Sequence, residues 1–142
     1  MAIAVVATAV VGAACSASTE EEGAERHVTP PAEARDYCAL VERFYGRLDQ
    51  FVSDTQQELG GDVSDAEFDQ RLVGFIRENQ QLFDQLEAAA PPAIAADAAI
   101  QAAAFEQVAV QGDLTPLETP EAKAAEDRTV EYEADKCGIV VE

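Results

Sequence analysis

The feature of this chain that most limits its possible folds is a regular recurrence of mostly apolar residues in segment 37–59. These residues follow one another at alternating spacings of four and three, with a second row one position later. This period places both rows on one side of an α-helix, whereas a strand would alternate every second residue. Because the apolar side is wide, we expect a helix that packs among several others. The two rows are Tyr37, Val41, Phe44, Leu48, Phe51 and Thr55, and Cys38, Tyr45, Val52 and Leu59.

A second helix is predicted to begin at Ser64 and to end before Pro91. Ser64 and Glu67 have the spacing of a capping box, in which each side chain bonds a backbone N–H at the start of a helix. Asn79 is the one polar residue on the main apolar row. We interpret it as a buried amide that bonds a neighbouring helix and fixes register, with a ligand contact as the alternative. The rows that follow the cap are Phe68, Leu72, Phe75, Asn79, Leu82 and Leu86, with Ile76 and Phe83 beside them.

Glycines, prolines and a capping threonine separate the helical segments. Gly60-Gly61 is predicted to end the first helix, and Pro91-Pro92 marks a turn before a third helix over about 93–111. Thr119-Pro120-Glu121 is a start signal for a fourth helix, and Gly138 supplies its stop. Four amphipathic segments joined by short loops predict an all-α domain over 32–142, built as an antiparallel four-helix bundle.

The first fifteen residues form an apolar run that closes on small residues and a cysteine. Residues 2–14 carry no charge, and as a helix they reach only about 20 Å, short of the roughly 30 Å of a bilayer core. The end of this run, Gly12-Ala13-Ala14 followed by Cys15, resembles the lipobox of bacterial lipoproteins. The resemblance implies that 1–14 is a signal peptide and that Cys15 is lipidated and anchors the protein at the extracytoplasmic face of the cell membrane. An ordinary cleaved signal and an uncleaved segment are the alternatives.

Residues 15–31 connect this anchor to the helical domain. They contain Glu20-Glu21-Glu22 and Pro30-Pro31 and show no apolar periodicity. Such a composition cannot bury enough surface to become ordered. We therefore predict a disordered acidic tether.

Two cysteines remain once Cys15 is assigned to lipid. An even number in a compartment that permits oxidation predicts a disulfide between Cys38 and Cys137. In an antiparallel bundle of four helices these two positions lie at the same end, so the cysteines and the topology agree. The domain then resembles small exported proteins of high-GC Gram-positive bacteria, in which a cysteine early in the first helix pairs with one in a terminal Cys-Gly. In this chain the terminal Cys-Gly dipeptide is Cys137-Gly138. Most proteins of this kind have no assigned activity.

The composition argues against several classes of function. The formal charge of −19, from 28 acidic and 9 basic residues, argues against binding to nucleic acid, which needs clustered basic residues. The single histidine, His27, lies in the tether, so the domain has no base beside a nucleophile and no zinc or di-iron ligand set. We expect no metal, no cofactor and no enzymatic activity, although paired carboxylates for glycosidic cleavage stay open among so many acids.

Two functional hypotheses fit this pattern. The leading one is a non-catalytic interaction or structural module of the cell envelope, held on the membrane through Cys15 and contacting an unknown envelope protein. The alternative is a small-molecule or lipid-binding module with a pocket between the helices. Against that alternative, aromatic residues at this spacing normally fill the core of a bundle. The candidate pocket residues are Phe44, Phe51, Phe75, Asn79 and Phe105.

Overall fold

The computed structural model describes residues 28–59 and 64–140, and this part of the chain is helical without a strand. The all-helical prediction is therefore confirmed. The predictions for the signal peptide, for Cys15, for most of the tether and for Gly60-Gly61 lie outside the described residues. The longer helices are α1 (Arg35–Leu59), α2 (Asp65–Glu78), α3 (Gln80–Ala89), α4 (Ala95–Gln111) and α5 (Pro120–Tyr132). Three short ones are the 3₁₀ turns η1 (Ala32–Ala34) and η2 (Thr115–Glu118) and the π-helical turn η3 (Glu133–Cys137).

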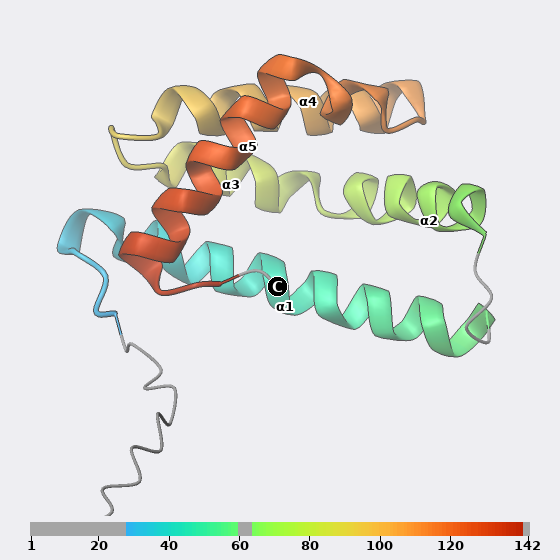
Figure 1. Ribbon diagram of the computed structural model, residues 1–142, viewed down its shortest axis with the longest axis horizontal. Helices are drawn as coiled ribbons and strands as arrows, with labels where there is room; N and C mark the ends of the chain where they lie inside the picture. The colour runs from blue at the N-terminus through green and yellow to red at the C-terminus, as the bar shows by residue number, and fades with distance from the viewer. Residues whose placement is uncertain (1–27, 60–63, 141–142) are drawn as a thin grey trace, which may run out of the picture.

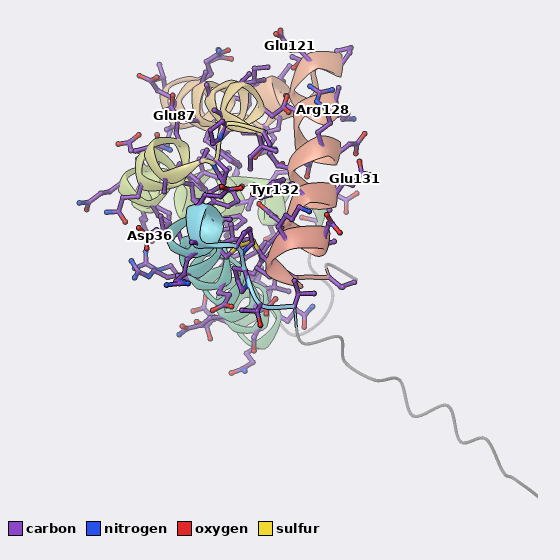
Figure 2. The ribbon with its side chains drawn as sticks, turned by 90° about the vertical axis from the view of Figure 1, so that its left-hand side faces the viewer. Asp36, Glu87, Glu121, Arg128, Glu131 and Tyr132 are labelled. Atoms are coloured by element: carbon purple, nitrogen blue, oxygen red, sulfur yellow. A yellow bond between two sulfur atoms is a disulfide. The ribbon has the colours of Figure 1, made fainter. Side chains whose placement is uncertain are left out.

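The long helices lie beside one another in a layered arrangement (Figure 1). From α1 the chain turns back through α2 and α3, and α4 reverses its direction again. The last long helix, α5, runs obliquely across the others and returns the chain to α1. Along the view of Figure 2, α1, α3 and α4 are seen nearly end-on and α5 lies along their open side.

The prediction of one uninterrupted helix after Ser64 is wrong, because the segment is divided at Asn79. Asn79 has φ −107° and ψ 13°, outside the helical range, and it separates α2 from α3. Its side-chain nitrogen donates to the carbonyl of Phe75 at 2.8 Å, so the amide competes for a helical acceptor. Its oxygen accepts from Arg47 Nη1 of α1 at 2.6 Å. The interpretation of Asn79 as a buried amide bonded to a neighbouring helix is confirmed, and the break accompanies it.

The predicted helix boundaries are mostly confirmed. Ser64 Oγ accepts from the backbone N–H of Glu67 at 3.4 Å, and Thr119 Oγ1 accepts from that of Ala122 at 3.2 Å. These bonds satisfy N–H groups that have no partner within the helix. At the other end, Gly138 takes a left-handed conformation, with φ 72°, directly after η3. A glycine accepts this conformation without the steric cost that a side chain would add.

The core consists of two clusters of buried side chains. The disulfide cluster surrounds the bond between Cys38 and Cys137, whose Cα atoms are 5.3 Å apart and 99 positions apart in sequence. The predicted disulfide is therefore confirmed. The aromatic cluster lies farther along α1 and joins it to α2, α3 and α4. The disulfide cluster contains Ala34, Tyr37, Cys38, Val41, Ile94 and Cys137, and the aromatic cluster is built on Val73, Phe75, Ile76, Phe83 and Val108 with Phe44, Phe51 and Phe105 against it.

Candidate ligand-binding cavity

A cavity of about 340 Å³ lies between the two clusters and is partly open to solvent. Its volume is within the range of about 300 to 1,000 Å³ that is common for small-molecule sites. Helices α1 to α5 all contribute to its walls, which are mostly apolar. Six aromatic side chains line it: Tyr37, Phe44, Tyr45, Phe75, Phe83 and Phe105.

The phenylalanines form a continuous aromatic wall. Phe83 of α3 stacks on Phe105 of α4, with ring centroids 4.0 Å apart and an interplanar angle of 13°. The ring of Phe44 of α1 packs edge-to-face with that of Phe83, with 5.7 Å between the ring centroids. It also contacts the tilted ring of Phe75 of α2, with 6.5 Å between the centroids. These contacts fix the ring orientations, since aromatic pairs prefer offset-stacked or edge-to-face geometry. The wall is therefore a rigid apolar surface to which four helices contribute.

A buried carboxyl group forms the polar side of the cavity. Glu133 is only 8% exposed, and each of its oxygens accepts a hydrogen bond from a tyrosine of α1. The Tyr37 hydroxyl donates to Oε1 at 2.8 Å, and the Tyr45 hydroxyl donates to Oε2 at 3.1 Å. A buried polar group is costly unless it is hydrogen-bonded, so the two tyrosines make this placement possible.

The disulfide and η3 bring Glu133 to this position. Tyr37 precedes Cys38 in α1, and Glu133 comes about one helical turn before Cys137, so the bond holds the carboxyl group beside the tyrosine. In η3 the backbone carbonyl of Glu133 accepts from the N–H groups of both Gly138 and Ile139. The same residue is thus held by its side chain on α1 and by its backbone at the end of η3.

The environment changes the acidity of this group and of its partners. Burial raises the pKa of Glu133, while the hydrogen bonds from Tyr37 and Tyr45 act in the opposite direction. Burial, and next the negative charge of Glu133, raise the pKa values of Tyr37 and Tyr45 far above the ordinary value of 10.0. Both hydroxyl groups therefore keep their protons at neutral pH and remain donors to the Glu133 carboxyl group.

Two further carboxyl groups lie on the cavity walls. Glu87 of α3 and Glu126 of α5 line the cavity and are exposed, so they lie where it meets solvent. Figure 2 shows Glu87 on the α3 and α4 side of the molecule, away from α5. Gln101 and Thr129 also line the cavity, and the side-chain nitrogen of Gln101 donates to Thr129 Oγ1 at 2.5 Å, which connects α4 to α5. Among the described residues, none that lines the cavity is lysine, arginine or histidine.

The structure brings three of the five candidate pocket residues to this cavity. Phe44, Phe75 and Phe105 line it, whereas Phe51 and Asn79 line a separate surface depression between α1 and α2. Phe75 also reaches that depression, because its ring lies between the two.

The sequence analysis did not assign the hydrogen-bonded group of the cavity, namely Tyr37, Tyr45 and Glu133, to a site. A signal for Glu133 was present, since it follows Thr129 by four positions and precedes Cys137 by four. That spacing puts it on the same side of the last helix as Cys137, the cysteine of the predicted disulfide. A carboxyl group on an inward-facing side is the observation that could have identified the site.

Neither a metal centre nor a membrane span is found in the part of the chain that the structure describes. Residues 28–59 and 64–140 contain no group of three or more histidine, cysteine or acidic side chains arranged to hold a metal ion. In the same ranges no helix combines the length and the hydrophobicity that crossing a membrane requires. Comparisons with protein-family models, curated proteins and solved structures gave no match for this chain. A proposal about function must therefore start from the cavity itself.

Proposed function

We propose that this protein is a non-catalytic binding module that holds a small, mostly apolar molecule in the cavity between its helices. The observation that carries the proposal is the cavity itself, about 340 Å³ in volume and partly open to solvent. Protein interiors are normally packed as closely as organic crystals, and an unfilled cavity lowers stability. A ligand that fills the space would restore the lost packing contacts.

The chemistry of the side chains supports binding rather than catalysis. The one histidine of the sequence is His27, ahead of the domain, and Cys38 and Cys137 are joined to each other. A nucleophilic mechanism needs a base beside an activated hydroxyl or thiol group. The hydroxyl groups of Tyr37 and Tyr45 donate to Glu133, but the pKa values of both are raised, so neither hydroxyl group is activated as a nucleophile.

The domain is proposed to be a variant of an antiparallel four-helix bundle. In this description α2 and α3 together serve as the second helix, and the chain reversals visible in Figure 1 support it. Bundles commonly place ligand sites between facing helices, which agrees with the position of the cavity.

The proposed location is the outer face of the cell membrane, with the domain tethered through a lipid on Cys15. Gly12-Ala13-Ala14-Cys15 supports this location by its resemblance to a lipobox, and so does the disulfide, since such bonds persist in oxidising compartments. Palmitate labelling and membrane fractionation of a Cys15→Ser variant test it. Labelling should disappear and the protein should leave the membrane fraction; retention equal to that of the wild type would exclude the lipid anchor.

Binding in the cavity is tested with a variant that fills it. Ala102 of α4 lines the cavity, whereas its neighbour Ala103 is exposed, so Ala102→Leu and Ala103→Leu form a matched pair. Native mass spectrometry of protein purified from its host should show a bound small molecule that Ala102→Leu reduces and Ala103→Leu retains. In addition, 1-naphthylmethanol, a neutral probe, should bind the wild type and Ala103→Leu more tightly than Ala102→Leu. Equal binding of the probe to all three proteins would contradict the proposal.

Contact with another envelope protein is the second candidate function. The observation that favours it is the net charge of −19 on a small chain, which would steer a basic partner toward the domain. Cross-linking in intact cells followed by mass spectrometry tests this candidate. A reproducible neighbour whose capture weakens at high salt would support it, and the absence of any reproducible neighbour would count against it.

A further inference from the structure

We propose that the ligand of the cavity is a lipophilic organic cation, whose ammonium group pairs with Glu133 while its apolar body lies on the aromatic wall. This inference deepens the proposed function and depends on it. It follows from the sign of the charges around the cavity, from the bonding capacity left on Glu133 and from the nature of the walls.

All the ionised groups on the described cavity walls are acidic. Glu133 lies in the interior, and Glu87 and Glu126 lie where the cavity meets solvent. The potential inside is therefore negative, and in a space bounded by apolar walls it is screened less than on an open surface. An anionic ligand such as a fatty-acid carboxylate would be repelled, whereas a cation would be attracted at the entrance and again in the interior.

Two basic residues of the closing part of the chain, Arg128 and Lys136, pair with acidic residues outside the cavity. Arg128 of α5 makes a forked contact with Asp97 of α4, with 2.6 Å between Nη2 and Oδ1. Lys136 pairs with Asp135 at 2.8 Å. Because no lysine, arginine or histidine lines the described cavity, none of its lining residues neutralises the carboxyl groups.

Glu133 retains acceptor capacity for an ammonium group. A carboxylate offers about four lone-pair positions, and the hydroxyl groups of Tyr37 and Tyr45 occupy one on each oxygen. The tyrosines fix the orientation of the carboxylate, since both oxygens are held from α1. A buried charge without a counter-ion is destabilising, so a bound cation would offset the cost of burying Glu133.

The aromatic wall suits the rest of such a ligand. Six aromatic rings surround the space, and their faces attract cations when the charge lies within about 6 Å of a ring centroid. The stacked pair of Phe83 and Phe105 gives an apolar surface for a ring or a short alkyl chain. A neutral hydrocarbon would use this surface but would leave Glu133 without a counter-ion.

Three naphthalene probes that differ in charge test the inference on the full chain. They are 1-naphthylmethylamine, a cation at neutral pH, 1-naphthylmethanol, which is neutral, and 1-naphthoate, an anion. The chain has no tryptophan, so naphthalene fluorescence can be followed directly, and signal that persists in Ala102→Leu is subtracted as binding outside the cavity. Because a hydrogen bond to a charged group contributes about 1.5 to 3 kcal/mol, the amine should bind about ten- to a hundredfold more tightly than the alcohol. The naphthoate should bind most weakly.

Two variants of equal net charge locate the effect. Glu133→Gln removes the buried charge and should abolish the preference for the amine while the alcohol still binds. Glu131→Gln removes an exposed charge from the same helix and should keep the wild-type preference. Circular dichroism checks that both variants fold. If Glu133→Gln does not fold, the ranking of the three probes on the wild type still decides the question.

The outcomes distinguish the inference from the proposed function. Equal affinity for the amine and the alcohol, both reduced by Ala102→Leu, would overturn the cation inference and leave a binding cavity. A preference for the amine that Glu133→Gln retains would also overturn it, because the charge responsible would lie elsewhere. Failure of all three probes to bind in a manner sensitive to Ala102→Leu would overturn both.

Discussion

The two clusters of the core are held together in different ways. The disulfide cluster unites segments from opposite ends of the domain through one covalent bond and the Glu133 hydrogen bonds. The aromatic cluster unites α1 to α4, which follow one another in the chain, through ring packing. Segments that are close in sequence lose less entropy when they meet, so packing alone can join them. The closing segment, η3, meets a helix that is far away in the sequence and therefore benefits from a crosslink.

The closing segment also offers little surface for packing. After α5 crosses the molecule, the short turn η3 and Tyr132 at the end of α5 contact α1. Of the five residues of η3, Glu133 and Cys137 are buried. One of these provides the polar contact and the other provides the covalent one, and the cavity lies between this closure and the aromatic wall. The same short turn therefore provides both the covalent crosslink of the domain and the polar side of the cavity.

Among the variants that test this comparison, removal of the disulfide should lower the free energy of unfolding the most. Cys38→Ala combined with Cys137→Ala opens a loop with a sequence separation of 99, and the chain-entropy model predicts a loss of about 4 to 5 kcal/mol. Urea unfolding followed by circular dichroism measures it. Cys15→Ser is the control and should leave the free energy of unfolding unchanged. A loss below about 1 kcal/mol would mean that packing alone closes the domain.

Truncating the aromatic wall tests the other end of the molecule. Phe83 is 3% exposed and contacts both Phe44 and Phe105, so Phe83→Ala should lower the free energy of unfolding by about 3 kcal/mol. Phe68→Ala, at the half-buried start of α2, should cost clearly less. Similar losses from the two variants in urea unfolding would show that the wall is not the main support of this end.

The hydrogen bonds to Glu133 provide a pH-dependent test of the closure. Tyr37→Phe leaves one carboxylate oxygen without its donor and should cost about 2 kcal/mol near neutral pH, the scale of a hydrogen bond to a charged group. Tyr132→Phe is the control, since no hydrogen bond of its hydroxyl group is seen within the described residues. It should change stability by less than about 0.5 kcal/mol.

The sign of the pH effect follows from the raised pKa of Glu133. A carboxyl group whose pKa is raised on folding stabilises the protein below its ordinary value of 4.5, and that contribution is lost as pH rises through the folded pKa. The Tyr37 hydroxyl lowers this pKa, so Tyr37→Phe raises it further and adds to the loss at higher pH. Urea unfolding should therefore show a small difference from the wild type at about pH 4 and a larger one near neutrality. The opposite order would exclude an ionised Glu133 as the acceptor.

The smallest expected effect concerns the break in the second helical segment. Asn79→Ala removes the hydrogen bonds to Arg47 and to the carbonyl of Phe75 and should cost about 1 kcal/mol. Gln81→Ala, at an exposed position in α3, should be nearly neutral. A stabilised Asn79→Ala variant would indicate that a continuous helix is preferred once the amide is gone. The Asn79 side chain, and not the packing of the aromatic cluster around it, would then be the cause of the break.

Local sequence signals determined the helices and their ends. The apolar spacing in 37–59 predicted α1, and the caps at Ser64 and Thr119 predicted two helix starts, because periodicity and backbone capping depend on neighbours a few residues away. Cysteine counting predicted the pairing of Cys38 with Cys137, because only two were left once Cys15 was assigned to lipid. The lipid anchor itself stays a prediction of the first fifteen residues.

Tertiary structure alone decided the break at Asn79, the hydrogen-bond partners of Glu133 and the separation of Phe51 from the cavity. Each depends on contacts between residues far apart in the chain, such as Arg47 with Asn79 and Tyr37 with Glu133. A helical pattern gives the side of the helix on which a residue lies, but it does not give the residue on the next helix that it meets. The crossing of α5 and the π-helical turn η3 bring Glu133 to Tyr37, and the packing of α1 against the α2–α3 break brings Arg47 to Asn79.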